Sequence, residues 1–121
     1  KVDIKEKVLL IKLSKSFSYN MSEVELYDYT RGIWIIIKEK RNEIEYVFCV
    51  YDGIVQETYN IIDWFPGGST YSVRHDKEEW KIHERWEFVG NISHEMRKKY
   101  RHKSVSHYFP SGSRNPVRYT F

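Results

Sequence analysis

An Asp-Gly pair between two apolar runs constrains the fold of this chain more than any other feature of its sequence. The runs cover residues 44–51 and 54–62, and both are rich in the β-branched and aromatic residues that favour strands. Between them, Asp52 and Gly53 suit the two positions of positive φ in a tight hairpin turn. The middle of the chain is therefore predicted to fold as antiparallel hairpins, which disfavours a parallel βαβ organisation.

Further strand patterns predict a small, curled β-barrel. They cover four segments: residues 8–13, 33–38, 70–74 and 85–90. The polar stretch EKRNE predicts a turn, and Trp64-Phe65-Pro66-Gly67-Gly68 predicts a break in the strand pattern. A length of 121 residues suffices for one domain, and 40% hydrophobic residues suffice for one core.

Two helix starts stand out among the strands. Ser22 and Glu25 form a capping box ahead of a short helix, and Gly32 is placed as the C′ residue of that helix. Ser93 caps a second helix with the sequence HEMRKKYR. We therefore expect a single domain over 1–121 of the α+β class, mostly β, in which a small, curled barrel carries two short helices.

Cysteine usage and hydropathy indicate a protein of the cytoplasm. The single cysteine, Cys49, excludes an internal disulfide framework, and its apolar neighbours (VFCVY) indicate a buried thiol. No apolar run approaches the roughly 18 residues that a membrane-spanning helix needs. The run LLI near the N-terminus is too short for a signal peptide.

Basic residues concentrate toward the C-terminal end of the chain. Residues 91–121 hold seven lysines and arginines against one acid, whereas residues 1–90 hold 13 bases and 16 acids. Such an asymmetry indicates a polyanionic partner, because lysine and arginine displace counterions from phosphates. The alternative is a cationic helix end that stabilises the helix dipole. The candidate phosphate-binding residues in this segment are Lys98, Lys99, Arg101, Lys103, Arg114 and Arg118.

The chain carries no recognised motif for catalysis, a metal or a cofactor. None of the five histidines pairs with Cys49 or with a carboxylate at a spacing typical of metal sites. Ser69 follows Gly67 and Gly68, but the spacing and the lysine of a phosphate-binding P-loop are missing. We therefore expect a binding domain rather than an enzyme, with no cofactor, no metal and no membrane partner.

The opening of the chain, VLLIKLSKSFSYNMSEVELYDYTRGIW, resembles that of PUA-like superfamily domains, particularly their YTH and EVE branches. In those domains a first strand and a polar turn lead to a short helix, and a tryptophan begins the next strand. Ile62-Asp63-Trp64 resembles the YTH stretch in which a strand ends at the second wall of a base-holding cage. The tail segments KSVSHYF and NPVRY look like those of small prokaryotic proteins of this type, and the composition is in keeping with a thermophilic, archaeal source.

This resemblance implies a function in nucleic-acid recognition. In YTH domains such tryptophans bracket the methylated base of N6-methyladenosine, so Trp34 and Trp64 would be the walls of a pocket for a flipped, modified base. Similar PUA-like modules lie at the N-terminus of McrB-type modification-dependent restriction subunits, where they recognise DNA. The implied function is that of a non-catalytic DNA-specificity domain of a restriction system, excised from a longer chain. The alternatives are an RNA-binding domain and a protein-interaction adaptor.

Each candidate pocket residue also has a structural alternative. Trp34 begins the run WIII and is either core filler or a ring at a pocket rim, whereas Trp64, in an expected loop, is harder to explain as core. Asp63 either accepts a hydrogen bond from a base amino group or caps a turn. Arg31 is either a phosphate clamp beside the pocket or the ion-pair partner of Asp28, three residues before it.

Overall fold

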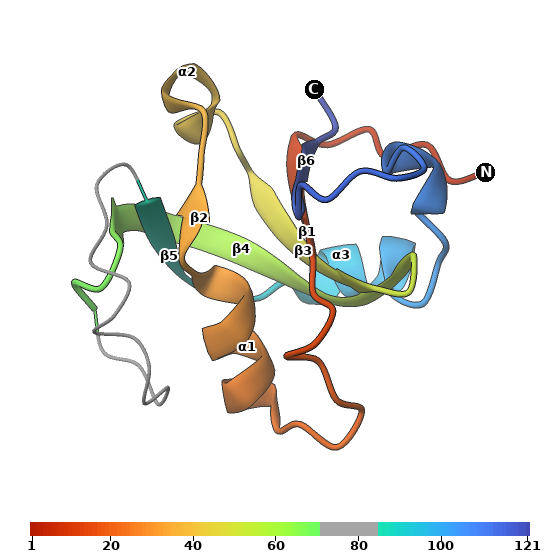
Figure 1. The fold of residues 1–121 in the computed structure, drawn as a ribbon, viewed down its shortest axis with the longest axis horizontal. Helices are drawn as coiled ribbons and strands as arrows, with labels where there is room; N and C mark the ends of the chain where they lie inside the picture. The colour runs from red at the N-terminus through yellow and green to blue at the C-terminus, as the bar shows by residue number, and fades with distance from the viewer. Residues whose placement is uncertain (71–84) are drawn as a thin grey trace.

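The computed structural model of the protein describes residues 1–70 and 85–121 (Figure 1). All but the first residue of the strand expected at 70–74 lies outside the described residues. The described strands are β1 (Val8–Lys12), β2 (Trp34–Ile35), β3 (Tyr46–Tyr51), β4 (Ile54–Pro66), β5 (Arg85–Ile92) and β6 (Val117–Tyr119). The described helices are α1 (Glu23–Arg31), α2 (Lys38–Arg41), α3 (His94–Tyr100) and the short 3₁₀ helix η2 (Ser106–Tyr108).

The described strands form one sheet in the order β2-β5-β4-β3-β1-β6. The antiparallel β3–β4 hairpin is confirmed, and Asp52 and Gly53 at its turn have φ values of 53° and 74°. β5 then pairs antiparallel with β4. β1, however, runs parallel to β3. The prediction that disfavours parallel pairing is therefore wrong for this pair, because α1, β2 and α2 provide the long crossover that parallel neighbours need.

The sheet curls until its two edge strands approach each other. Just beyond β2, the backbone N–H of Ile37 donates to the Tyr119 hydroxyl of β6 at 2.9 Å. The Lys40 ammonium donates to the Phe121 carbonyl and lies 4.9 Å from the centre of the Tyr119 ring. These contacts nearly close the sheet into a barrel (Figure 1), so the predicted class, a small α+β fold made mostly of strands, is confirmed.

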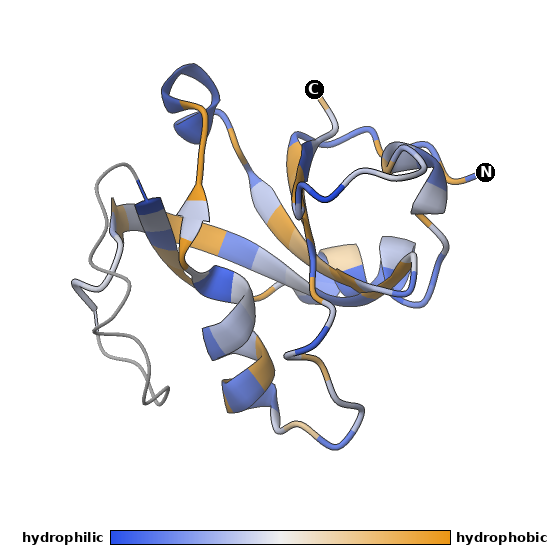
Figure 2. Cartoon of the chain, viewed as in Figure 1, coloured by the Kyte–Doolittle hydropathy of each residue, from blue (hydrophilic) through white to orange (hydrophobic). Residues whose placement is uncertain are grey.

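β1 and β3 are buried on both faces and separate two hydrophobic clusters. Successive side chains of a strand point to opposite faces, so the unbroken apolar runs VLLI and VFCV supply both clusters. The inner cluster, inside the barrel, includes Leu9, Ile11, Val47, Cys49, Tyr59, Phe88 and Val117. The outer cluster, covered by α3, includes Val8, Leu10, Phe48, Val50, Met96 and Tyr100. The apolar residues of this one domain therefore form a cluster on each face of the sheet. Figure 2 shows the apolar residues along these strands and the hydrophilic residues on α2.

Both predicted helix starts are confirmed. Ser22 Oγ accepts the backbone N–H of Glu25 at 3.1 Å, and the Glu25 carboxylate accepts the N–H of Ser22 at 3.3 Å. Ser93 Oγ accepts a backbone N–H of α3 at 3.2 Å. Gly32 does end α1, but in an extended rather than left-handed conformation (φ −173°). Glycine is needed there because a Cβ would lie 2.7 Å from the Cβ of Glu87 on β5.

Two predicted boundaries around the tryptophans are wrong. The strand expected at 33–38 shortens to β2, because Ile36 turns into the inner cluster and the helix-forming stretch KEKR builds α2. This makes three described α-helices instead of the two predicted. β4 continues through Trp64 to Pro66 instead of breaking at 64, since this stretch pairs with β5.

Candidate functional site

The two tryptophans predicted as pocket walls lie on one face of the sheet. Trp34 pairs with Trp86, and Trp64 pairs with Phe88 two residues further along β5, so all four rings share the face that carries the inner cluster. The indole N–H of Trp34 donates to the Thr30 carbonyl of α1 at 2.7 Å. The Trp64 ring lies nearly perpendicular to the Phe88 ring, with 5.6 Å between their centres.

This packing favours the core alternative for both indoles. Trp64 lies in a strand rather than a loop, and its Nε1 is buried without a hydrogen-bond partner in the described structure. Asp63 is exposed, and its Oδ1 accepts the backbone N–H of Trp64 at 2.8 Å, beside the shift in β4–β5 register after Ile61. Asp63 therefore bonds to the neighbouring backbone within β4 rather than in the turn that was expected there.

Arg31, whose alternatives were a phosphate clamp and an ion pair, is buried, with its side chain 5% exposed. Its Nε donates to the Asp28 carboxylate at 3.0 Å. Its Nη1 donates to the Thr70 hydroxyl at 2.6 Å and the Phe88 carbonyl at 3.3 Å, and lies 3.4 Å from the Glu87 carboxylate. The ion pair with Asp28 is confirmed, and the buried guanidinium joins the end of α1 to β5.

Two of the six C-terminal cations are engaged within the fold. The Lys99 ammonium lies 2.8 Å from the Glu6 carboxylate. Arg118 on β6 donates from Nη2 to the Ser113 hydroxyl at 2.6 Å, and its Nε is buried without a partner in the described structure. These two side chains therefore have structural roles that limit their availability to a bound anion.

The other four cations are more open. Lys98, Lys103 and Arg114 are exposed, and none of them forms an ion pair with any residue in 1–70 or 85–121. Arg101 is intermediate: its Nε donates to the backbone carbonyl of Gln56 at 2.9 Å, while its side chain stays 35% exposed. Of the predicted set, these four offer positive charge at the surface.

Arg97, which was not predicted as a site residue, joins three elements. Its Nε and Nη2 donate to the two oxygens of Glu57 on β4 at 2.8 and 2.7 Å, and Nη2 also reaches Glu23 of α1 at 2.9 Å. Burial alone would raise the pKa of Glu57, but the hydrogen bonds from Arg97 and from the Thr58 N–H keep that pKa below its ordinary value. The pKa of Arg97 is raised, chiefly by its hydrogen bonds to Glu57 and then by that to Glu23. Arg97 and Arg101, whose Nη2 lies 3.8 Å from Glu57, together balance the two negative charges of Glu23 and Glu57.

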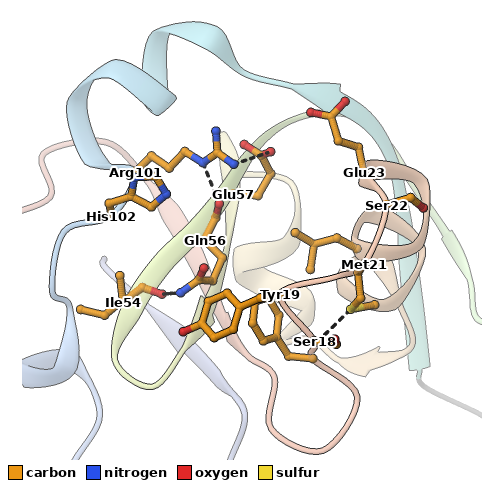
Figure 3. A pocket seen from close by; sticks show the side chains of 12 residues that line it. Ser18, Tyr19, Met21, Ser22, Glu23, Ile54, Gln56, Glu57, Arg101 and His102 are labelled. Carbon is orange, nitrogen blue, oxygen red and sulfur yellow. Dashed lines mark hydrogen bonds and ion pairs between the residues drawn. The ribbon is translucent and has the colours of Figure 1, made fainter.

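A hollow of about 370 Å³ lies beside this network, and we refer to it as the α1–α3 hollow (Figure 3). Gln56 and Glu57 of β4 lie at its back, and Arg101 and His102 form one side. The other side comes from the start of α1 and the loop before it, over residues 17–26. Neither Trp34 nor Trp64 lines this hollow.

Backbone pairing fixes the cationic side of the hollow. After α3, the N–H of His102 donates to the Val55 carbonyl at 2.8 Å, and the N–H of Val55 donates to the Lys103 carbonyl at 3.0 Å. His102 takes a positive φ of 70° at this point, which turns the chain back along β4. Arg101, His102 and Lys103 are therefore held in place by the sheet rather than by a loop.

Aromatic rings form one edge of the hollow and were missed by sequence reasoning. Phe17 and Tyr51 stack with their centres 4.4 Å apart, and Tyr19 stands nearly perpendicular to both. Tyr19 lies at the lower edge in Figure 3 and is 75% exposed. The available signal was the pair of aromatic residues in the polar stretch SKSFSYN, which belongs to no strand or helix pattern.

The described residues show few other chemically distinctive groups. They contain no group of three or more His, Cys, Asp or Glu side chains that could hold a metal ion. Cys49 is buried in the inner cluster, and burial raises the pKa of its thiol to about 12, which makes it a poor nucleophile. No described helix has the length and apolar character that crossing a membrane requires.

The function of the chain has to be inferred from its own residues. The exposed cations that follow α3 and the adjoining α1–α3 hollow are the features that bear on it. No protein-family model, no curated protein and no solved structure matches this chain.

Proposed function

We propose that this domain is a non-catalytic nucleic-acid-binding module that holds the phosphates of a strand with the cations at and beyond the end of α3. One observation carries the proposal. Lys98 and Lys103 expose ammonium groups that form no ion pair with the described residues, and Lys103 directly follows His102, which lines a hollow edged by aromatic rings. Exposed cations attract phosphates, and aromatic faces accept bases without regard to sequence.

The helix dipole explains only part of this charge. Lys98 lies in the last turn of α3, where a cation stabilises the helix end. Lys103 follows the last residue of the helix by three positions, and Arg114 lies in the segment before β6. Lys103 and Arg114 lie outside any described α-helix, so the helix dipole does not explain them. Binding of an anion explains their charge better.

The finer identity of the domain is also a proposal. The resemblance of its opening residues to PUA-like domains, together with a nearly closed barrel that has α1 inserted after β1, supports a PUA-like module. We take DNA as the favoured target and RNA as the second. A modified, flipped base would be its specific ligand, and a restriction system of the cytoplasm would be its setting, within a longer chain.

A titration with labelled oligonucleotides tests the proposal. Single- and double-stranded DNA and RNA are titrated by fluorescence anisotropy between about 50 and 200 mM salt. Lys98→Gln and Lys103→Gln are compared with Lys38→Gln, which removes the same charge from an exposed position on α2. Each of the first two variants should lower the slope of log K against log salt by about 0.7–0.9, the value of one phosphate contact, and Lys38→Gln should not.

Two results would contradict this function. One is the absence of binding to all four nucleic acids at low salt. The other is a set of three variants that all bind like the wild type, since this would show that charge near α3 is not involved.

A protein-interaction role is the second candidate, and exposed apolar residues favour it. Ile35 and Ile37 are exposed, and close by the Arg41 guanidinium lies 3.7 Å from the centre of the Trp86 ring. Apolar and aromatic side chains flanked by arginine are typical of binding hot spots. Lack of nucleic-acid binding at every salt concentration would favour this candidate.

A further inference from the structure

We infer that the α1–α3 hollow holds one unpaired nucleobase of the bound strand, with Tyr19 as the ring on which that base stacks. The inference rests on the proposed nucleic-acid-binding function and adds the place where a base is held. This place is different from the pocket that Trp34 and Trp64 would form, which is the one implied by the resemblance.

Tyr19 is exposed yet held in place. With 75% of its surface open to solvent, the side chain gains little from burial. Its ring nevertheless lies 4.9 Å from Phe17 and 5.8 Å from Tyr51, at 88° to each, and those two rings stack on each other at 23°. A ring ordered by its neighbours loses little conformational entropy when a ligand stacks on it.

Gln56, at the back of the hollow, offers hydrogen-bonding capacity that the fold barely uses. Its Nε2 lies 3.3 Å from the Ile54 carbonyl and 3.4 Å from the Tyr51 carbonyl, both at the long end for such bonds. Its Oε1 accepts no hydrogen bond from a described residue. An amide presents both a donor and an acceptor, which is what the hydrogen-bonding edge of an unstacked base requires.

The charges around the hollow place a phosphate next to that base. Glu23 and Glu57 line the hollow, but Arg97 pairs with both of them. On the opposite side, Arg101 lies 3.8 Å from Glu57 with its side chain 35% exposed, and the neighbouring Lys103 forms no ion pair with a described residue. A strand with one base in the hollow would therefore meet cations along its backbone.

The size of the hollow favours a single unpaired base. Pockets that hold small ligands run from about 300 to 1,000 Å³, and the 370 Å³ of this hollow lies near the lower limit. A base inside a duplex would have to leave its stack to enter, at a cost that single strands avoid. Binding should therefore be tighter for single strands than for duplexes of the same sequence.

Tyr19→Ala tests the stacking, and Tyr19→Phe is its matched control. The probes are single-stranded oligodeoxythymidylate, single-stranded oligouridylate and an abasic deoxyribose strand with the same number of phosphates. Tyr19→Ala should weaken binding to both base-carrying strands about 5- to 100-fold, the range found when a stacking ring is removed. It should leave the abasic strand and the salt slope unchanged, and Tyr19→Phe should bind like the wild type. Because Tyr19 is so exposed, thermal unfolding of both variants should match that of the wild type.

The outcomes separate this inference from the function on which it rests. If the wild type binds no strand, both are overturned. If Lys103→Gln lowers the salt slope while Tyr19→Ala binds like the wild type, the function stands and the hollow as a base site is overturned. Photocrosslinking from a strand with 5-iodouracil gives an independent location: a crosslink to Tyr19 or Phe17 supports the inference, and one to Trp34 or Trp64 overturns it.

Discussion

Replacing Glu57 with glutamine tests the ion-pair network that joins β4, α3 and α1. The carboxylate is 2% exposed, accepts two hydrogen bonds from Arg97 at 2.8 and 2.7 Å, and lies 3.8 Å from Arg101. Glutamine has nearly the same size and keeps one carbonyl acceptor. The amide NH₂ of glutamine, however, would face the second N–H of Arg97, so two donors would meet without an acceptor. The negative charge of the carboxylate is also lost.

Glu57→Gln should lower the free energy of unfolding by about 2 kcal/mol at neutral pH. One charge-assisted hydrogen bond is lost, and such a bond contributes about 1.5–3 kcal/mol. Breaking a fully buried ion pair costs more, about 3–5 kcal/mol. The lower range applies because the Arg97 side chain is 23% exposed and keeps its ion pair with Glu23 at 2.9 Å.

The lowered pKa of Glu57 fixes how this loss depends on pH. The folded-state pKa lies below the ordinary value of 4.5, so the unfolded chain binds more protons between those two values. The ionised carboxylate therefore stabilises the fold above about pH 4.5, and this contribution disappears as the pH falls through the folded-state pKa. Glutamine does not titrate in this range, so the difference in unfolding free energy between wild type and Glu57→Gln, the stability gap, should narrow as the pH falls below about 4.5.

Urea unfolding followed by tryptophan fluorescence measures that gap, at pH values from about 7 down to about 3. Glu39→Gln, at an exposed position on α2, is the control and should follow the wild type throughout. Equal stability of Glu57→Gln and wild type at neutral pH would refute the reasoning. So would a gap that keeps its full size at pH 3, since the loss would then not come from the charge.

Three further predictions concern local features of the fold. Ser22→Ala removes the acceptor of the α1 capping box and should lower the unfolding free energy in urea by about 0.5–2 kcal/mol. Gly90→Ala would place a Cβ 1.9 Å from the Asn60 carbonyl oxygen, so cooperative thermal unfolding should be lost or shifted far down. Cys49 should resist a thiol reagent in the native protein at pH 8 and react after urea unfolding, because burial raises its pKa to about 12; a fast reaction of the native protein would contradict this.

The features that could be predicted from the sequence are those whose determinants are local. The β3–β4 hairpin follows from Asp52 and Gly53, which adopt the positive φ values that their types favour. The helix starts follow from Ser22, Glu25 and Ser93, which bond to backbone groups within three residues. In each case the interaction forms between near neighbours, so the order of residues is enough.

The features that could not be predicted depend on residues far away in the chain. Arg31 is held partly by Glu87, 56 residues later, and nothing near Arg31 shows that β5 will lie over it. Trp64 precedes Pro66 and two glycines, a local signal for a break, but pairing with Phe88 keeps the strand intact. The α1–α3 hollow likewise joins residues 17–26, β4 and the end of α3, which only the folded sheet brings together.

Burial separates the aromatic rings that the fold needs from those that remain available for binding. Trp34 and Trp64 pack on the inner cluster next to β5, so moving either ring to contact a base would remove apolar surface from the core. Tyr19 carries no such constraint, because most of its ring already faces solvent and its hydroxyl suits an aqueous rim. A stacking partner in this domain is therefore expected among the rings whose loss leaves the barrel intact. Tyr19, which lines the same hollow as Arg101 and His102, meets that condition, and the indoles do not.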